Sequence, residues 1–298
     1  MERKGKKKKS GMCILVVLMM MAVIAVFVYK IEPNPTVSIA LDKLNSPNAI
    51  LIRLKDHTTL LDKNSGVKIY PASLTKIMTA IVALENIHDL KEEIKLTNST
   101  FRGLYEADAS MAGFQPGEQV RALDLLYGVL LPSGAECCVG LANKVAGSQQ
   151  NFVKMMNEKA AKLGMKNTHF ENVTGLQNEN HYTTVADLAI LLSYSLKNDT
   201  FREIFTSARY STKPTNKHTD GITFNSTMFE KLNNKKITGG EILGGKTGYT
   251  SAAGLCLASL SKVGTQEYVF VTAGAKGDSH SEQFNITDAI AVYSSIGK

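Results

Sequence analysis

The spacing of apolar residues divides the chain into strand-like ends and a helical middle. Strand-like runs are predicted at 49–54 and 58–61, and a helix is predicted over 73–86. Between about 90 and 235 the pattern is mainly helical and is interrupted by Gly and Asn/Asp turns, with the clearest helices at 122–131, 134–145, 152–163 and 185–196. Near the C-terminus, two runs alternate as half-buried strands do and a closing helix follows, at 254–260, 268–273 and 284–296. This order predicts an α/β (α+β) domain whose sheet combines both ends of the chain, with a helical region inserted between them.

The first 47 residues have a different character. Residues 1–11 contain six basic side chains and one acidic one, and residues 12–29 contain no charge. At about 1.5 Å per residue, that apolar run spans about 27 Å, close to the thickness of a bilayer core. Basic residues before an apolar run predict a cytoplasmic tail (1–11), a transmembrane signal-anchor (12–29), a stalk (30–47) and an extracytoplasmic domain (48–298). No small-residue cleavage site ends the run, so we expect a single-pass protein of the cell membrane, with a cleaved signal peptide as the alternative.

Charge and composition exclude several classes of function. The net charge is +7, but the tail carries +5 of it, which leaves +2 for the remaining residues. A nucleic-acid partner is therefore not expected, since its binding surface would make the folded part basic. The six histidines, among them His169 and His181, have no His-x-x-x-His or His-x-His spacing, and no Cys-x-x-Cys occurs. We predict neither a metal site nor a cofactor, and interpret these histidines and the thiols as structural.

The best candidate nucleophile lies at the start of the first predicted helix. In Pro-Ala-Ser-Leu-Thr-Lys, Ser73 and Lys76 are three residues apart and therefore share a helix face. A serine hydroxyl needs a nearby base to attack a carbonyl, and a lysine can be that base only when neutral. Burial and a second positive charge would both lower the pKa of Lys76. The same Ser-x-x-Lys spacing occurs at Ser65 and Ser259, in a turn and in a strand, where it places nothing on a common face.

Two further motifs give this pair a context. Lys246-Thr247-Gly248 occurs once, followed by Tyr249 and Thr250, at the predicted edge of a strand. A lysine and a threonine there can bind a carboxylate, and the glycines allow close approach of a substrate backbone. Between the two motifs, Ser133-Gly134 stands at a loop-to-helix junction, where Ser133 could relay a proton. The three elements, in this order, are the signature of active-site serine penicillin-recognising enzymes.

The predicted exported part, roughly 35–298, resembles serine-type D-alanyl-D-alanine carboxypeptidases of the low-molecular-mass penicillin-binding proteins. The resemblance extends to the segments 113–118, 122–128, 163–176 and 181–188. It implies the serine β-lactamase/DD-peptidase-like fold, with an antiparallel sheet flanked by helices. It further implies Ser73 as acylated nucleophile, Lys76 as general base, Ser133 as proton relay, and Lys246 and Thr247 as carboxylate ligands. The backbone N–H groups of Ser73 and Tyr249 would form the oxyanion hole.

This chain departs from the family pattern at two places. Members usually carry Asn two residues after the middle serine, where this chain has Ala135, and Glu136 is not expected to replace it because it points about 100° further round a helix. An Arg often found on the last strand corresponds to Lys276, which lacks the bidentate fork of Arg. The chain also ends soon after the predicted catalytic part, so we expect no further C-terminal domain.

The resemblance implies a membrane-anchored D,D-carboxypeptidase that removes the terminal D-Ala of peptidoglycan stem peptides ending in D-Ala-D-Ala, with β-lactams as covalent inhibitors. Two alternatives stay open. A serine β-lactamase of the same fold would need a deacylating Glu, for which Glu171 and Glu179 lie in the right region. A protein that only binds β-lactams or muropeptides would follow if the loss of the Asn had removed hydrolysis. A contribution to glycopeptide resistance is a further, weaker hypothesis.

Overall fold

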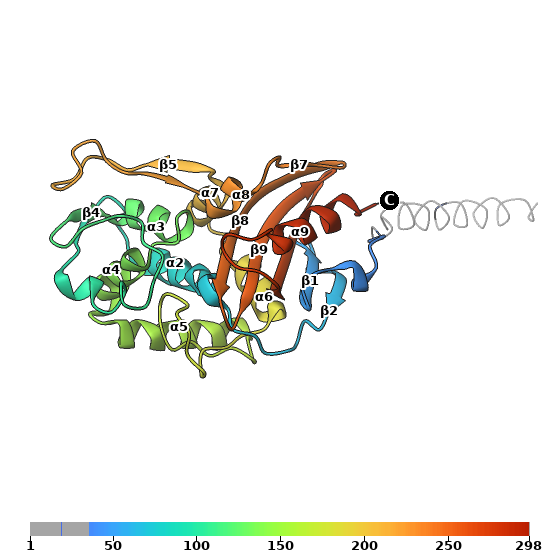
Figure 1. The fold of residues 1–298 in the computed structure, drawn as a ribbon, viewed down its shortest axis with the longest axis horizontal. Helices are drawn as coiled ribbons and strands as arrows, with labels where there is room; N and C mark the ends of the chain where they lie inside the picture. The colour runs from blue at the N-terminus through green and yellow to red at the C-terminus, as the bar shows by residue number, and fades with distance from the viewer. Residues whose placement is uncertain (1–18, 20–35, 298) are drawn as a thin grey trace, which may run out of the picture. The chain divides into compact units, whose positions relative to one another are not determined.

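A six-stranded antiparallel sheet runs through the folded part of the chain (Figure 1). The computed structural model describes residue 19 and residues 36–297. The strand order is β2-β1-β10-β9-β8-β7, so strands from the two ends of the chain lie side by side. Their bounds are Asn48–Arg53 (β1), Thr59–Lys63 (β2), Lys236–Ile237 (β7), Gly240–Thr250 (β8), Gly254–Val263 (β9) and Gln266–Ala275 (β10). The predicted sheet from both termini is confirmed.

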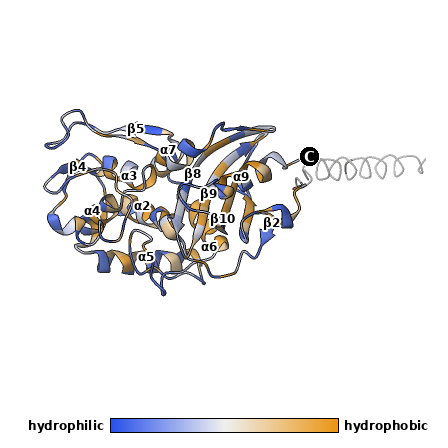
Figure 2. Ribbon diagram, viewed as in Figure 1, coloured by the Kyte–Doolittle hydropathy of each residue, from blue (hydrophilic) through white to orange (hydrophobic). Residues whose placement is uncertain are grey.

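Buried apolar residues lie on both faces of this sheet, and Figure 2 colours much of its strands as hydrophobic. In β1, Ile50 and Ile52 belong to the core formed with the inserted helices, while Ala49 and Leu51 belong to the core formed with α9 (Phe284–Ser294). The alternation in 254–260 and 268–273 therefore does not mark half-buried strands, because both faces of β9 and β10 are buried. Polar side chains on these strands find internal partners, as when Ser259 Oγ donates to Phe270 O at 3.2 Å.

The segment between β2 and β7 is the predicted helical insertion. It contains α2 (Thr75–Asn86), α3 (Ala122–Leu130), α4 (Ala135–Ala146), α5 (Gln149–Leu163), α6 (Val185–Ser195), α7 (Asp199–Thr206) and α8 (Thr227–Lys231). The apolar pattern did not predict its two short hairpins, β3 (Glu93–Lys95) with β4 (Gln119–Arg121) and β5 (Arg209–Ser211) with β6 (Thr223–Asn225). Strands of three residues are too short to show a period.

Part of the predicted stalk belongs to the compact unit Val37–Lys298, which is the unit predicted to be catalytic. Val37 pairs with Ile296, and the backbone N–H groups of Asn45 and Ser46 donate to the Asp288 carboxylate at 2.9 and 2.8 Å. Leu44 is buried in the α9 core. Apart from Met19, the predicted transmembrane segment 12–29 lies outside the described residues, and none of the helices described is long and apolar enough to span a bilayer.

Candidate active site

The Ser73 side chain lies in a tight turn at the start of α2. Residues Ala72–Leu74 form a 3-10 turn, and the α-helix begins at Thr75, two residues later than the sequence predicted. Lys76 Nζ donates to Ser73 Oγ at 3.0 Å and to the backbone oxygen of Thr174 at 2.8 Å. The predicted nucleophile and base are thus within hydrogen-bond reach, which general-base activation of a serine requires.

The environment of Lys76 favours its neutral form. Its side chain is buried, and this desolvation lowers the pKa of Lys76 below the usual value. The nearby thiols supply no countercharge at neutral pH, because burial raises the pKa of Cys138 to about 12. Glu136 is the one acidic carboxyl group whose charge acts to raise the pKa of Lys76, and burial raises the pKa of Glu136 as well. The site therefore favours a lysine that can accept a proton.

The Lys-Thr-Gly motif lies on β8, along an edge that is mostly unpaired. β7 pairs only with Gly240 and Glu241 of β8, so the rest of that edge has no neighbouring strand among the described residues. Thr247 Oγ1 lies 2.7 Å from Thr227 Oγ1 of α8. A β-carbon on Gly248 would come within 3.1 Å of the Ser73 backbone nitrogen, so a glycine is needed for this close approach. The strand edge and the nucleophile turn are direct neighbours.

Lys246 is entirely buried, and its Nζ donates to the backbone oxygen of Thr247 at 2.9 Å. Desolvation, and then the charge of Lys76, lower the pKa of Lys246 well below the usual lysine value. Burial and mutual repulsion therefore disfavour charging both amines at once, and an anionic substrate group beside them would offset that repulsion.

The middle motif presents a hydroxyl without a partner. Ser133 has φ of +70°, and its side chain is buried. Its Oγ accepts and donates no hydrogen bond within the described residues. Ala135 begins α4 and offers a methyl group where the family pattern has an amide. Glu136 does not replace that amide, because its Oε1 accepts backbone N–H groups of Ala112 and Gly113 at 2.7 and 2.9 Å.

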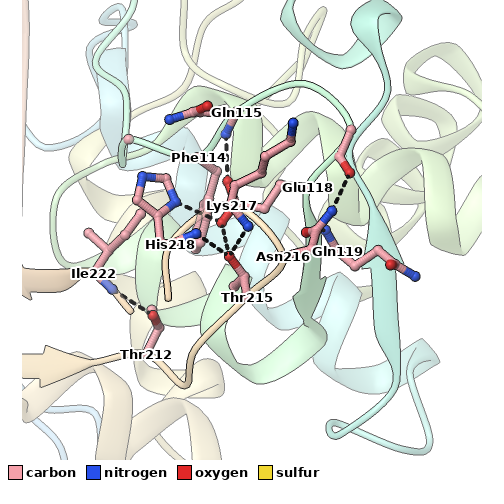
Figure 3. Close-up of polar contacts among 12 residues, drawn as sticks. Phe114, Gln115, Glu118, Gln119, Thr212, Thr215, Asn216, Lys217, His218 and Ile222 are labelled. Carbon is pink, nitrogen blue, oxygen red and sulfur yellow. Dashed lines mark hydrogen bonds and ion pairs between the residues drawn. The ribbon is translucent and has the colours of Figure 1, made fainter. Parts of the chain in front are cut away.

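Residues 107–110 form one wall of the cleft, and the chain that follows this wall is bound by two buried carboxylates. Glu136 binds its Ala112–Phe114 end, and the tip of the β5–β6 hairpin supports the chain just beyond it (Figure 3). There the buried Glu118 carboxylate accepts Thr215 Oγ1 at 2.6 Å and lies 2.9 Å from His218 Nδ1 (Figure 3). The wall is therefore fixed by two internal carboxylates, neither of which the sequence pattern identified.

Two cavities meet at Ser73. The first, of about 440 Å³, is lined by residues that include Lys76, Ala135, Tyr249 and Thr250. The second, of about 420 Å³, is lined by residues that include Ser133, Thr247, Gly248 and Tyr249. The two cavities together are lined by predicted site residues from three separate parts of the sequence: Ser73, Lys76, Ser133, Thr247, Gly248, Tyr249 and Thr250.

Three predicted residues lie elsewhere. Lys276 follows β10, is exposed and lines neither cavity, so its predicted contact with a carboxylate is without support in this geometry. Glu171 and Glu179, the candidate deacylating residues, are exposed and line neither cavity, and Glu171 pairs with His169 at 2.9 Å.

Sequence reasoning missed the backbone oxygen of Thr174, which binds Lys76, and the loop residues Asp108 and Ser110, which line both cavities. The Asn172-Val173-Thr174-Gly175 stretch belongs to the family resemblance, which assigns it no role in the site. Gly175 was the residue in this stretch that could have indicated a close contact. It has φ of +86° and packs on Ala72.

Comparison with known proteins agrees with this geometry. A family model for D-alanyl-D-alanine carboxypeptidases matches residues 35–277. D-alanyl-D-alanine carboxypeptidase DacF of Bacillus subtilis is 35% identical over 76% of this chain and 57% of its own length, and DacC of Escherichia coli is 34% identical over 77% and 56%. The chain thus spans little more than half of these relatives.

Solved structures give the same result for the fold. The crystal structure of the Streptomyces K15 DD-transpeptidase has a TM-score of 0.76 and 26% identity, covering 86% of this chain and 99% of that one. A D-alanyl-D-alanine carboxypeptidase structure from Mycobacterium tuberculosis has a TM-score of 0.74 at 24% identity, over 88% and 94% of the two chains, and supports the fold alone. The predicted β-lactamase/DD-peptidase-like fold is confirmed, and the chain belongs to the D-alanyl-D-alanine carboxypeptidase family.

Proposed function

We propose that this protein is a serine D,D-carboxypeptidase that removes the terminal D-Ala from peptidoglycan stem peptides. The observation that carries the proposal is the 3.0 Å contact between Ser73 Oγ and a buried Lys76 amine, in a cleft that also contains Ser133 and Thr247. This arrangement suits acyl transfer through a serine ester.

In the first half-reaction, Ser73 Oγ attacks the carbonyl carbon of the penultimate D-Ala while its proton passes to Lys76 Nζ. The proton then reaches the amide nitrogen through the Ser133 hydroxyl, the C–N bond breaks, and D-Ala leaves. The backbone N–H groups of Ser73 and Tyr249 stabilise the oxyanion. In the second half-reaction, water attacks the ester carbon and gives its proton to Lys76. The C–O bond to Ser73 then breaks, Ser73 Oγ takes that proton, and the shortened peptide is released.

The terminal carboxylate of the substrate would supply a negative charge beside the two buried lysines, Lys76 and Lys246. Thr247 lines the cavity that also contains Ser133, and buried Lys246 lies next to Thr247 in the chain. A carboxylate bound there would raise the pKa of Lys246 and restore its charge. β-Lactams carry a carboxylate beside a reactive amide, so we expect them to acylate Ser73.

The site disfavours the β-lactamase alternative, since Glu171 and Glu179 both lie outside the cavities. The binding-protein alternative has one observation in its favour, the methyl group of Ala135, which lines the first cavity two residues after Ser133 in the chain.

We further propose that residues 12–29 anchor the protein in the cell membrane, with the catalytic unit outside the cytoplasm. The support is the uncharged run itself and the basic residues before it. Extraction of the full chain from membranes only by detergent, and not by salt or alkali, is the expected result.

Trimming of D-Ala-D-Ala ends could also reduce glycopeptide binding, and unchanged glycopeptide susceptibility after deletion would contradict that role.

The decisive experiment measures D-Ala release from diacyl-Lys-D-Ala-D-Ala by the wild-type protein and by Ser73→Ala. Release that disappears in the variant supports the proposal. Acylation by a fluorescent penicillin without D-Ala release would instead support the binding protein, and rapid penicillin turnover would support the β-lactamase.

A further inference from the structure

His181 is a buried titratable residue that the chemistry above does not use. Its side chain is 2% exposed, and its ring packs edge-on against Phe170 with centroids 5.6 Å apart. It belongs to the 169–184 segment, which also supplies the Thr174 oxygen to Lys76. The spacing of the histidines in the sequence predicted only a structural role for it.

The hydrogen bonds of His181 determine which ring nitrogen carries the proton. The backbone N–H of Glu171 donates to His181 Nδ1 at 3.1 Å, so Nδ1 is an acceptor. The proton is therefore on Nε2, which lies 2.8 Å from Thr75 Oγ1 and donates to it. Thr75 Oγ1 in turn donates to the backbone oxygen of Ala72 at 2.8 Å. Burial lowers the pKa of His181 to about 4, which keeps this neutral form at physiological pH.

This relay ends on a strained residue. Ala72 immediately precedes Ser73 and has φ of +46°, in the left-handed region that disfavours residues with a β-carbon. Gly175 packs against the same carbonyl, since a β-carbon on Gly175 would lie 1.8 Å from Ala72 O. The strained turn is thus held by the Thr75 hydroxyl and by the 169–184 segment.

We propose that His181 is a positioning residue for the nucleophile: its Nε2–H, acting through Thr75, holds the Ala72 carbonyl so that Ser73 Oγ meets Lys76 Nζ. His181 touches neither substrate nor the reacting atoms. The inference rests on the proposed function only in taking Ser73 as the acylated group.

The test compares two substitutions that retain different halves of the ring. His181→Gln keeps a donor near the Nε2 position, whereas His181→Asn keeps only an acceptor near Nδ1. We expect His181→Asn to slow acylation of Ser73 by a fluorescent penicillin about 10- to 100-fold, with little change in the KM for peptide. His181→Gln should recover most of the rate. His169→Asn, on the same segment but with its side chain 43% exposed, is the matched control and should leave the rate unchanged.

A double-mutant cycle separates positioning from general destabilisation. Thr75→Val removes the middle of the relay, so its effect on acylation should not add to that of His181→Asn. Equal rates for the Asn and Gln variants, or additive losses with Thr75→Val, would overturn the proposal. Thermal melting of each variant checks that it is folded. If the wild type releases no D-Ala, the proposed function fails, while the acylation rates still decide the role of His181.

Discussion

The two serines that meet at the second cavity are held in opposite ways. Ser73 is bonded to Lys76, and the turn that carries it is tied to Thr75 and Gly175. Ser133 is buried, yet its hydroxyl has no partner within the described residues. The nucleophile side is completed by the protein, while the middle-motif side needs a partner from the substrate. Because Ser133 lines the second cavity, a substrate amide bound there can supply that partner.

Removing the nucleophile tests the first side of this comparison most strongly. Ser73→Ala should lower D-Ala release and penicillin acylation by at least about 10³-fold, because no other hydroxyl there has a base within reach. Peptide mapping of the penicillin adduct gives the position of the ester. Ser65→Ala, in another Ser-x-x-Lys sequence, is the control and should keep both activities. An adduct that persists in Ser73→Ala would contradict the assignment.

Lys76→Ala should lower acylation by about 10²- to 10⁴-fold, since it removes the general base. In the wild type, kcat/KM should decline as pH falls through the lowered pKa of Lys76, because only the neutral amine accepts a proton. A pH–rate profile measures this acidic limb, the pH range over which kcat/KM declines. A limb at the ordinary lysine value of 10.5 would show that burial does not tune the base. Lys68→Ala, at an exposed lysine, serves as the control.

Substitutions in the middle motif should be able both to lower and to raise activity. Ser133→Ala should slow acylation about 10-fold by removing the relay. Ala135→Asn should raise kcat/KM for the peptide several-fold by supplying an amide where the cavity wall has a methyl group. Steady-state kinetics of both variants provide the measurement. Ala135→Val adds comparable bulk without polarity, and an equal gain from it would show that hydrogen bonding is not the cause.

The smallest expected effect concerns the cleft wall. Glu136→Gln keeps an acceptor for the Ala112 and Gly113 N–H groups but removes the charge, so stability should fall by about 1–3 kcal/mol. Urea unfolding monitored by circular dichroism measures the change. Exposed Glu106→Gln is the comparison and should alter stability by less than about 0.5 kcal/mol. Equal stabilities of the two variants would mean that the buried carboxylate does not support the wall.

The catalytic pair was predictable because it is local. Ser73 and Lys76 are three residues apart, in a 3-10 turn and in the first turn of the helix that follows it, and helical spacing already predicts that they lie together. The strands 254–260 and 268–273 were located correctly, but their exposure was not, because alternation cannot show that α9 covers the second face.

The features of the site that the sequence did not predict depend on contacts between residues far apart in the chain. His181 reaches Thr75 across 106 residues, and Thr174 reaches Lys76 across 98. Ala72, with its strained φ, packs against Gly175 of the same 169–184 segment, so nothing in the local Pro-Ala-Ser sequence indicates the strain. Ala135 was visible in the sequence as a departure, but the isolation of the Ser133 hydroxyl became apparent only from the packing around it.

The pairing of Val37 with Ile296 brings the two ends of the catalytic unit together. A short polar linker could join them, and new termini could be opened at the exposed β9–β10 turn around Gly264. Such a circular permutant would retain the order of the strands in space while changing their order along the chain. The catalytic unit can therefore be inserted into another protein through a single site, with its cleft unaltered.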